Sequence, residues 1–390
     1  MTSSDYDFLP ASADPDPYAE LADLRSRCPL MYSEAHGGHW LALGYEVAHD
    51  IAIDPITFSS NHGVSFPPIP YPPAPPVEYD PPLHKQFRAP MLDRFAPRAV
   101  ATYEPFYRQT VADLLSPALE RGEIEVVGQL LQPMTGRVAA NFLGAPDEDM
   151  RQLSDWAAAF MTGGVDGSAE VMPKIVGYFT GMYHDRRANP VDDIPSLMIS
   201  LDIDGEPMSE NEFVLMMTNI FNGALDSTVS AGAYIFEWLA VHPEERKRLA
   251  TEPELIPTAV EEFLRHFVPF MALRRVATRD REVHGHTIRK GETVLLHWLA
   301  ANHDPAEFAD PEEIILDRHP NRHFTFGVGI HRCLGSNVAR QELRILLEEV
   351  LDRIGDWDLD PDRPAVRYQG VTRGVRELWL HFEPGGASRA

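Results

Sequence analysis

Residues 326–335 read FGVGIHRCLG, and this segment, called the cysteine loop below, is the most informative part of the 390-residue chain. Its three glycines let the backbone turn tightly and approach a flat ligand closely. Cys333 comes just before a long helical pattern, so a thiolate there would face the positive end of a helix dipole. His331 and Arg332 add positive charge beside it. The segment therefore predicts a chemically active cysteine at the start of a helix.

Three kinds of site fit the cysteine loop. A cysteine hydrolase would use Cys333 as nucleophile, but the sequence does not place its histidine base or an orienting Asn or Asp. A zinc site would use His323, His331 and Cys333, although His-x-Cys is an unusual spacing for zinc ligands. A haem–thiolate site needs one cysteine, a glycine-rich loop and cations for two propionates, and the sequence supplies all three. The G-x-S-x-G, H-E-x-x-H and phosphate-loop motifs do not occur in the sequence.

The composition excludes several classes of protein. Lys plus Arg number 34 and Asp plus Glu number 59, and the resulting net charge of −25 repels the phosphates of nucleic acids. The two cysteines, Cys28 and Cys333, are too few for a disulfide scaffold or a four-thiolate zinc site. We find neither a secretory signal nor the run of about 20 apolar residues that spans a membrane. We therefore expect a soluble, cytoplasmic protein with no membrane and no nucleic-acid partner.

A long helix is predicted over residues 209–241. Ser209 and Glu212 form a capping box at its start, and Pro243 lies just beyond its end. Its centre, Asn222–Thr228, is rich in Gly, Asn, Asp and Ser, which weaken helices. Residues with low helix propensity at the centre of the longest predicted helix tend to mark a functional or strained site.

The remaining patterns predict a mainly α fold with a minor β portion. One helix is predicted after Pro257 through Arg265. Another covers residues 334–354, where apolar positions recur every three or four residues. Residues 275–300 and 366–383 alternate between apolar and polar and carry glycine turn signals, which predicts short antiparallel hairpins.

Proline is concentrated in residues 66–82, FPPIPYPPAPPVEYDPP, which hold nine of the 34 prolines. This proline-rich segment cannot form a helix and is expected to run extended. One interpretation is a stiff linker or a docking motif for a partner. The other, which we adopt, is a semi-rigid loop that lies over a substrate site and its entrance.

The cysteine loop matches F-G-x-G-x-H-x-C-x-G at every fixed position, and this is the pattern of the cytochrome P-450 superfamily of haem–thiolate monooxygenases. The resemblance extends over residues 15–385. Three further motifs occur in the order that the family has them. They are H-x-x-x-R at His84–Arg88, A/G-x-D-T/S-T at Ala224–Thr228 and E-x-x-R at Glu262–Arg265.

Within the superfamily, the chain resembles the soluble bacterial type. The short length and the lack of a membrane anchor carry this resemblance. Gly37–Trp40 and Pro320–His323 are similar to segments of the camphor- and cineole-hydroxylating branch.

The resemblance implies a single haem–thiolate domain over residues 1–390, with a long central helix over the haem, small antiparallel sheets and a flexible segment at residues 1–14. It also implies haem b as cofactor, with Cys333 as the iron ligand. Arginine suits the carboxylates of the haem because it pairs with them in bidentate fashion. The residues that match haem-binding positions of the family are Cys333, His84, Arg88, Arg275, His331, Phe326 and Gly327. The residues expected to form a buried structural network are Glu262, Arg265 and Arg318.

Oxygen activation in such an enzyme requires protons delivered to bound dioxygen. The resemblance makes Asp226 the acid of this relay and Ser227 or Thr228 its alcohol. The family usually has Thr where Ser227 stands, and Ser lacks the methyl group that restricts the rotamers of Thr. Which of the two hydroxyls orders the relay water therefore stays open.

The expected substrate is a small-to-medium hydrophobic molecule, because ligand pockets are largely apolar with a few polar groups. Terpenoids fit this description, and the sequence does not choose between them and aromatic acids, steroids or macrolides. Besides the proline-rich segment, the expected pocket residues are Asn219, Asn222, Gly223, Met271, Leu273 and Val371.

The predicted activity is insertion of one atom of O2 into the substrate, with electrons from a 2Fe–2S ferredoxin and its reductase. Arg332, Arg340 and Arg344 are expected to form a basic patch for this partner in an otherwise acidic protein. A peroxide-using peroxygenase is one alternative. The other is a haem-binding protein without turnover, which the Ser at position 227 keeps open.

Overall fold

The computed structural model describes residues 3–4, 6–7, 17–68, 72–162, 164–369 and 372–385. Contacts divide the chain into two compact units, and each unit gathers segments that are distant in sequence. Unit 1 consists of Met1–Lys85, Glu261–Leu334 and Tyr368–Arg373. Unit 2 consists of Gln86–Val260, Gly335–Arg367 and Gly374–Ala390.

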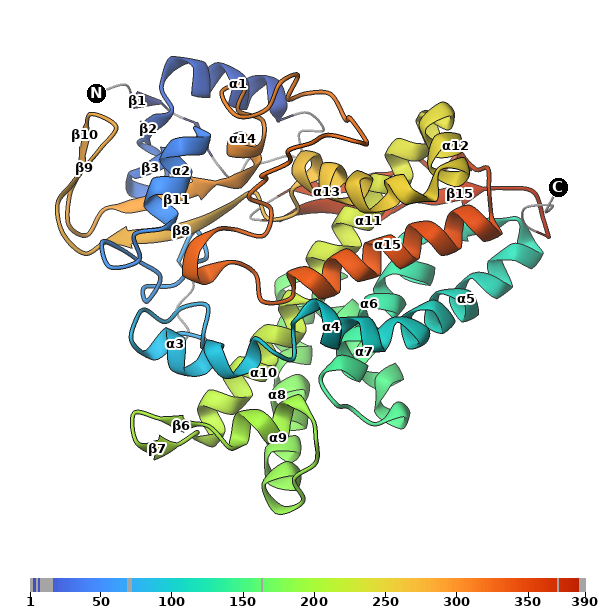
Figure 1. The fold of residues 1–390 in the computed structure, drawn as a ribbon, viewed down its shortest axis with the longest axis horizontal. Helices are drawn as coiled ribbons and strands as arrows, with labels where there is room; N and C mark the ends of the chain where they lie inside the picture. The colour runs from blue at the N-terminus through green and yellow to red at the C-terminus, as the bar shows by residue number, and fades with distance from the viewer. Residues whose placement is uncertain are drawn as a thin grey trace. The chain divides into compact units, whose positions relative to one another are not determined.

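Unit 1 is built on a six-stranded sheet of order β1-β2-β3-β11-β8-β4. Figure 1 shows its N-terminal strands beside strands from late in the chain. The strands are β1 (Ser3–Ser4), β2 (Leu30–Ser33), β3 (His39–Ala42), β4 (Phe58–Ser59), β8 (Ala272–Ala277) and β11 (Thr293–His297). β1 pairs with β2, and β3 with β11, in parallel, whereas the other three pairs are antiparallel. The sheet is therefore mixed.

The hairpins predicted over residues 275–300 are confirmed. β8 pairs with β11, and β9 (Arg281–Val283) pairs with β10 (His286–Ile288) between them. The strand pattern stops at His297, because Trp298–Asn302 form the short helix α14. Within the segment expected to be flexible, Ser3–Ser4 form β1, while residues 1–2, 5 and 8–14 lie outside the described residues.

Helices α1 (Tyr18–Arg27), α2 (Tyr45–Ala52) and α14 contribute to unit 1. α2 buries Val47, Ala48, Ile51 and Ala52, which recur at helical spacing and join the core around the sheet. α3 (Leu83–Arg88) and α13 (Ile256–Phe267) cross from one unit to the other along the chain. The helix predicted after Pro257 is thereby confirmed.

Unit 2 is mainly helical, and Figure 1 shows α5 and α15 running side by side in it. Its helices are α4 (Pro97–Val100), α5 (Glu104–Arg121), α6 (Gln132–Phe142), α7 (Asp147–Thr162), α8 (Gly164–Ala188), α9 (Ile194–Ile199), α10 (Glu210–Gly223), α11 (Asp226–Val241), α12 (Pro243–Thr251) and α15 (Ser336–Arg353). Its small sheets use β5 (Glu123–Glu125), β12 (Asp358–Leu359), β15 (Trp379–His381), β6 (Asp202–Ile203) and β7 (Glu206–Pro207). The mainly α fold class is confirmed.

The predicted helix over residues 334–354 is α15, which buries the expected apolar stripe. The final hairpin is also present, formed by β13 (Val366–Gln369) and β14 (Arg373–Glu377). Gly370 and Val371, which separate the two strands in the sequence, lie outside the described residues.

The predicted long helix is interrupted, and the prediction of one helix over residues 209–241 is wrong in this respect. The capping box is present, since Ser209 accepts from the backbone N–H of Glu212, whose side chain accepts from the Ser209 N–H. α10 then ends at Gly223, and α11 begins at Asp226. The break falls in the stretch of weak helix formers, where Gly and Asp oppose continuation of the helix.

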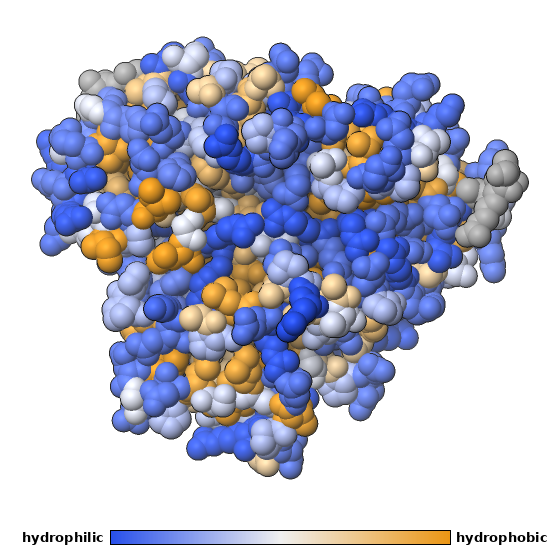
Figure 2. Space-filling model, viewed as in Figure 1, coloured by the Kyte–Doolittle hydropathy of each residue, from blue (hydrophilic) through white to orange (hydrophobic). Residues whose placement is uncertain are grey.

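The face drawn in Figure 2 is dominated by hydrophilic residues, as expected for a chain of net charge −25. In the described part of the chain, no helix is long and apolar enough to cross a bilayer.

Candidate functional site

The cysteine loop folds back on itself before α15. The N–H of Cys333 donates to the carbonyl of Phe326 at 2.7 Å, which closes the loop. Gly327 and Gly329 have φ angles of +66° and +74°, a region that favours glycine. A Cβ at Gly329 would lie 3.1 Å from the carbonyl oxygen of Ala52, so any side chain would press against the end of α2. The loop therefore holds the exposed Cys333 in a defined position.

The residues of the zinc alternative do not assemble into a metal site. His323 Nε2 lies 3.1 Å from a carboxylate oxygen of Glu261, and His331 Nε2 lies 3.2 Å from the hydroxyl of Ser60. Among the described residues, no group of three or more His, Cys, Asp or Glu side chains is arranged to hold a metal ion. The described residues therefore do not support the zinc hydrolase alternative.

Three of the predicted haem-binding residues, His84, His331 and Arg275, lie within unit 1. The rings of His84 and His331 are 4.7 Å apart between centroids. Arg275 on β8 is buried, and its Nη1 donates to the carbonyl of Arg274 at 2.8 Å. Burial lowers the pKa of Arg275 to about 10, although the nearby Asp80 acts in the opposite direction.

Arg275 forms no ion pair with any carboxylate of the described residues. The attraction of Asp80 offsets only part of the cost of burying this guanidinium, and a directly bonded anion would lower that cost further. The surroundings of Arg275 therefore suit an anionic ligand. Arg88 lies on α3, one helical turn after His84 in the same motif, and is half-buried.

Glu262 is a fully buried carboxylate at the centre of an ionic network. It accepts hydrogen bonds from Arg265, from Arg318 at 3.0 Å and from the side chain of Asn321 at 3.0 Å. Burial would raise the pKa of Glu262, but the hydrogen bonds and charge of Arg265 outweigh it and the pKa is lowered. The network ties α13 to the segment that leads into the cysteine loop. Asn321 belongs to it, and no motif in the sequence pointed to this residue.

The predicted relay residues lie at the start of α11, within unit 2. Asp226 is the first residue of this helix and is half-buried. The hydroxyl of Ser227 donates to the carbonyl of Gly223 at 3.4 Å, across the helix break. Thr228 is buried, and its hydroxyl donates to a carboxylate oxygen of Glu342 on α15 at 3.5 Å. The two alcohols therefore have different surroundings.

The predicted pocket residues divide between the units. Asn222 on α10 donates to the sulfur of Met172 at 3.8 Å, and its buried Oδ1 has no hydrogen-bond partner among the described residues. Asn219 is half-buried, and Gly223 is exposed. In unit 1, Met271 belongs to the hydrophobic core and Leu273 packs against it. Val371 lies outside the described residues.

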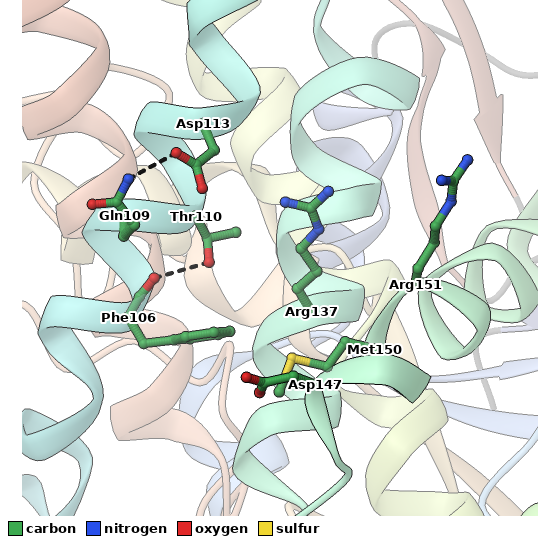
Figure 3. Close-up of a pocket in the computed structure, with 8 residues that line it drawn as sticks. All are labelled: Phe106, Gln109, Thr110, Asp113, Arg137, Asp147, Met150 and Arg151. Carbon is green, nitrogen blue, oxygen red and sulfur yellow. Dashed lines mark hydrogen bonds between the residues drawn. The ribbon is translucent and has the colours of Figure 1, made fainter.

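Unit 2 also contains a cavity of about 290 Å³ between α5, α6 and α7, which sequence reasoning missed (Figure 3). It carries no motif, and none of the predicted site residues lines it. Within it, Gln109 donates to Asp113 at 2.7 Å and Thr110 to the carbonyl of Phe106 at 2.8 Å. Its lining residues are Phe106, Gln109, Thr110, Asp113, Arg137, Asp147, Met150 and Arg151.

The proline-rich segment is held by a buried carboxylate in its described part. Glu78 accepts hydrogen bonds from the backbone N–H groups of Val64 at 3.0 Å and Ala74 at 2.9 Å. Val64 in turn accepts from the N–H of Arg274 on β8 at 2.9 Å. Residues 69–71 lie outside the described residues. Glu78 thus fastens the segment to the sheet of unit 1.

The predicted basic patch is wrong for Arg344. This side chain binds Glu104 at 2.6 Å and Glu348 at 3.0 Å, so its charge is neutralised within unit 2. Arg340 is half-buried and its Nη1 donates to the carbonyl of Ser336 at 3.5 Å. Arg332 is exposed on the cysteine loop.

Comparison with known proteins agrees with the motifs and the fold. The family model for cytochrome P450 matches residues 165–365. Cytochrome P450 130 of Mycobacterium tuberculosis is 32% identical over 316 residues, which are 79% of this chain and 78% of the relative. Linalool 8-monooxygenase of Pseudomonas putida is 29% identical over 345 residues, or 86% of this chain and 81% of the relative. The crystal structure of CYP109E1 from Bacillus megaterium with testosterone superimposes with a TM-score of 0.85 at 28% identity, covering 94% of this chain and 99% of that structure.

The chain belongs to the cytochrome P450 family. Members of this family incorporate oxygen from O2 into their substrates and carry haem b on a cysteine thiolate. The residues present fit this cofactor, because the cysteine loop presents one thiol and Arg275 is a buried cation without a carboxylate partner among the described residues. The relatives support a bacterial P450 and do not single out the camphor- and cineole-hydroxylating branch.

Proposed function

We propose that this P450 hydroxylates a small-to-medium hydrophobic substrate, with electrons from a 2Fe–2S ferredoxin, and that Asp226 and Ser227 handle the protons. The observation that carries the proposal is the break between α10 and α11, which leaves an acid and a hydroxyl side by side at a helix start. An enzyme that used peroxide directly would have no need of this pair.

Cys333 supplies the thiolate that holds the iron. When bound, haem b activates O2 at its iron, and electron donation from the thiolate favours O–O cleavage. Phe326 and Gly327 lie at the start of the cysteine loop, which the N–H of Cys333 closes at its other end. This hydrogen bond supports a rigid binding loop for the cofactor.

The carboxylates of the cofactor are bound by Arg275, with Arg88, His84 and His331 as further donors. Arg275 contributes most, because it is buried and pairing gives its guanidinium a directly bonded carboxylate. Charge-assisted hydrogen bonds from a guanidinium to a carboxylate are about twice as strong as neutral ones.

Ser227 is the alcohol of the proton relay, and Thr228 has a structural role. The Thr228 hydroxyl is buried and engaged with Glu342, whereas the Ser227 hydroxyl is half-buried and reaches the carbonyl of Gly223. Asp226 holds the proton at its carboxyl group, and Ser227 orders the water that passes it on. Serine rotates more freely than threonine, so this water is held less tightly than it would be by Thr.

The substrate-contacting residues of unit 2 are Asn219, Asn222 and Gly223, and those of unit 1 are Met271, Leu273 and the described part of the proline-rich segment. Asn222 offers a buried Oδ1 acceptor, which favours a hydrophobic molecule with one hydroxyl donor. The names of two similar proteins suggest the first compounds to test, linalool and testosterone. Both carry an apolar skeleton with a hydroxyl group.

The first experiment is an absorption spectrum of the reduced protein under carbon monoxide. A strongly red-shifted Soret band is expected for the wild type and for the control variant Cys28→Ser. The thiol of Cys28 is buried and donates to the carbonyl of Leu30, so it is already engaged elsewhere. Cys333→Ser is expected to lose the band. Its retention in Cys333→Ser would refute the assignment of the thiolate. Titration with linalool and testosterone, followed by the spin-state change, then tests the substrate class.

The electron source is tested separately. Product formation with NADPH, ferredoxin reductase, a 2Fe–2S ferredoxin and O2 is compared with product formation from hydrogen peroxide alone. We expect the complete electron chain to support turnover and peroxide to support little. The exposed Arg332 is the proposed docking cation, so Arg332→Gln should slow reduction by the ferredoxin and leave substrate affinity unchanged. Efficient turnover with peroxide alone would favour the peroxygenase alternative.

A further inference from the structure

The cavity between α5, α6 and α7 lies wholly within unit 2, and the proposed mechanism does not use it. Its volume of about 290 Å³ is near the lower end of the range of ligand pockets, which is about 300–1,000 Å³. None of the residues assigned to haem, substrate or relay lines it. The size of the cavity therefore suits a small organic molecule at a second site.

One part of the lining is apolar. Phe106 on α5 is half-buried, and Met150 on α7 is 7% exposed. The ring of Phe106 extends from α5 toward Met150 (Figure 3). Aromatic rings and thioethers both make favourable contacts with an aromatic group. This part of the cavity thus suits the apolar body of a ligand.

Two guanidinium groups of the lining have no ion pair with any of the described residues. Arg137 on α6 is half-buried, and Arg151 on α7 is exposed. In Figure 3, Arg137 lies between the side chains of α5 and Arg151. A guanidinium matches a carboxylate through two parallel hydrogen bonds. The cavity therefore offers a carboxylate a partner next to an apolar surface.

The two carboxylates of the lining already have local compensation. Asp113 accepts a hydrogen bond of 2.7 Å from the side chain of Gln109. Asp147 is exposed and is the first residue of α7, where the helix dipole favours a negative charge. The charge that lacks a partner is therefore positive. The same two carboxylates would repel a ligand that carries several negative charges.

The wall made by α6 and α7 is preformed. A Cβ at Gly136, next to Arg137, would lie 2.6 Å from the Oγ of Ser154 and 2.8 Å from its Cα, so only glycine allows this close approach. Tyr178 on α8 donates to a carboxylate oxygen of Asp149 at 2.9 Å, which fixes the first turn of α7. A ligand would enter a wall that is already assembled, and this lowers the cost of binding.

We propose that this cavity binds a small monocarboxylate that carries an aromatic or branched apolar group. Its carboxylate pairs with Arg137, while Arg151 adds positive charge at the rim. Its apolar group lies against Phe106 and Met150. Because the ligand contacts three helices of unit 2 and is absent from the unfolded chain, its binding raises the stability of the protein.

The test compares four small probes on the holoenzyme by calorimetry and by thermal unfolding. The probe 3-phenylpropionate has both parts of the proposed ligand. The amide 3-phenylpropanamide removes the charge, phenethylamine reverses it, and acetate removes the ring. We expect saturable binding and a raised Tm with 3-phenylpropionate, and about tenfold weaker binding or none with the other three. Equal binding of the amide or the amine would overturn the proposal.

Substitutions of Arg137 test the carboxylate partner. Arg137→Gln should weaken binding of 3-phenylpropionate about tenfold, and Arg137→Lys should weaken it less, because Lys keeps the charge but not the bidentate geometry. The matched control is Arg98→Gln, an exposed arginine on α4 of unit 2 that does not line the cavity. It should leave the affinity unchanged. If Arg137→Gln does not fold, Arg137→Lys decides the matter, and an unchanged affinity there contradicts pairing with Arg137.

The location is tested by soaking crystals with 3-(4-bromophenyl)propionate. We expect an anomalous bromine peak between Phe106 and Met150, without a spin-state change in the absorption spectrum. No peak in the cavity, or a spin-state change that follows the binding curve, would show that the probe binds elsewhere and refute the site. If the carbon monoxide spectrum lacks the red-shifted band, the proposed function fails, and the bromine peak still tests this cavity.

Discussion

Arg265 binds both carboxylate oxygens of Glu262, at 2.8 and 2.9 Å, and neither side chain is exposed to solvent. Removing one partner of such a buried pair leaves a charge without compensation. We expect Glu262→Gln to lower the free energy of unfolding by about 3–5 kcal/mol, measured by urea denaturation. The control is Glu170→Gln, because Glu170 pairs with Lys174 on the exposed surface of α8 and its loss should have a much smaller effect. Equal effects of the two substitutions would contradict a structural role for the network.

Replacement of Arg275 by Gln should act in opposite directions on two properties. The protein without haem should become more stable, because a buried cation without an ion pair disappears. Haem should be lost about 10- to 100-fold faster to apomyoglobin, because one charge-assisted hydrogen bond contributes about 1.5–3 kcal/mol. Arg281→Gln, on the exposed surface, should change neither property. Unaltered haem transfer in Arg275→Gln would show that Arg275 does not bind the cofactor.

Substitutions of the two adjacent hydroxyls should separate catalysis from stability. Ser227→Ala is expected to increase peroxide release at the expense of product, whereas Ser227→Thr should decrease it, because Thr has fewer accessible rotamers. Thr228→Val should lower thermal stability by about 1 kcal/mol through loss of a buried hydrogen bond. Product yield, peroxide and unfolding are measured for each. If Ser227→Ala leaves coupling intact, the relay alcohol is not Ser227.

The raised pKa of Glu342 predicts how stability depends on pH. The pKa of about 8 in the folded protein lies above the ordinary value, near 4.5, of the unfolded chain. Between these values the folded state binds more protons, so stability is full below about pH 4.5 and falls as the pH rises through 8. Relative to Glu342→Gln, the wild type should lose about 1.4 kcal/mol of unfolding free energy per pH unit in this window. Parallel pH profiles of the two proteins would rule out the shift.

Removal of the Glu78 carboxylate should loosen the proline-rich segment. Glu78→Ala leaves the N–H groups of Val64 and Ala74 without their acceptor. We expect faster hydrogen exchange at both amides and weaker substrate binding, with little effect on haem content. Glu46→Ala, in the first turn of α2, is the control and should leave exchange at these amides unchanged. Unaltered exchange in Glu78→Ala would indicate that other contacts hold the segment.

Much of the fold follows from local patterns in the sequence. The capping box at Ser209, the apolar stripe of α15 and the glycine turns of the hairpins each depend on near neighbours, and the structure confirms them. The parallel pairs of the sheet were not predicted, because β3 and β11 are distant in sequence and no local signal records their pairing. The sequence showed a stretch of weak helix formers around Ala224–Leu225 but not the helix break itself, because the balance between helix and turn there depends on tertiary packing.

The sequence predicted only those parts of the candidate site that a local motif marks. The motif of the cysteine loop pointed to Cys333 and His331, and their roles remain predictions. Glu342 was missed, although a Glu within an apolar helical stripe was a signal that could have drawn attention to it. The pairing of Arg344 with Glu104 could not be foreseen, because it joins two helices that approach each other only in the folded unit.

The mixed sheet of unit 1 has a consequence for the order of events during synthesis. Trp40 on β3 pairs with Val294 on β11, so the N-terminal strands cannot complete their hydrogen bonds until most of the chain has left the ribosome. Pairing over such a long loop is slow, and strand edges that wait for it are prone to aggregation. Until then, β3 is an open edge that a chaperone could protect, and a nascent chain arrested before residue 293 would leave it uncovered.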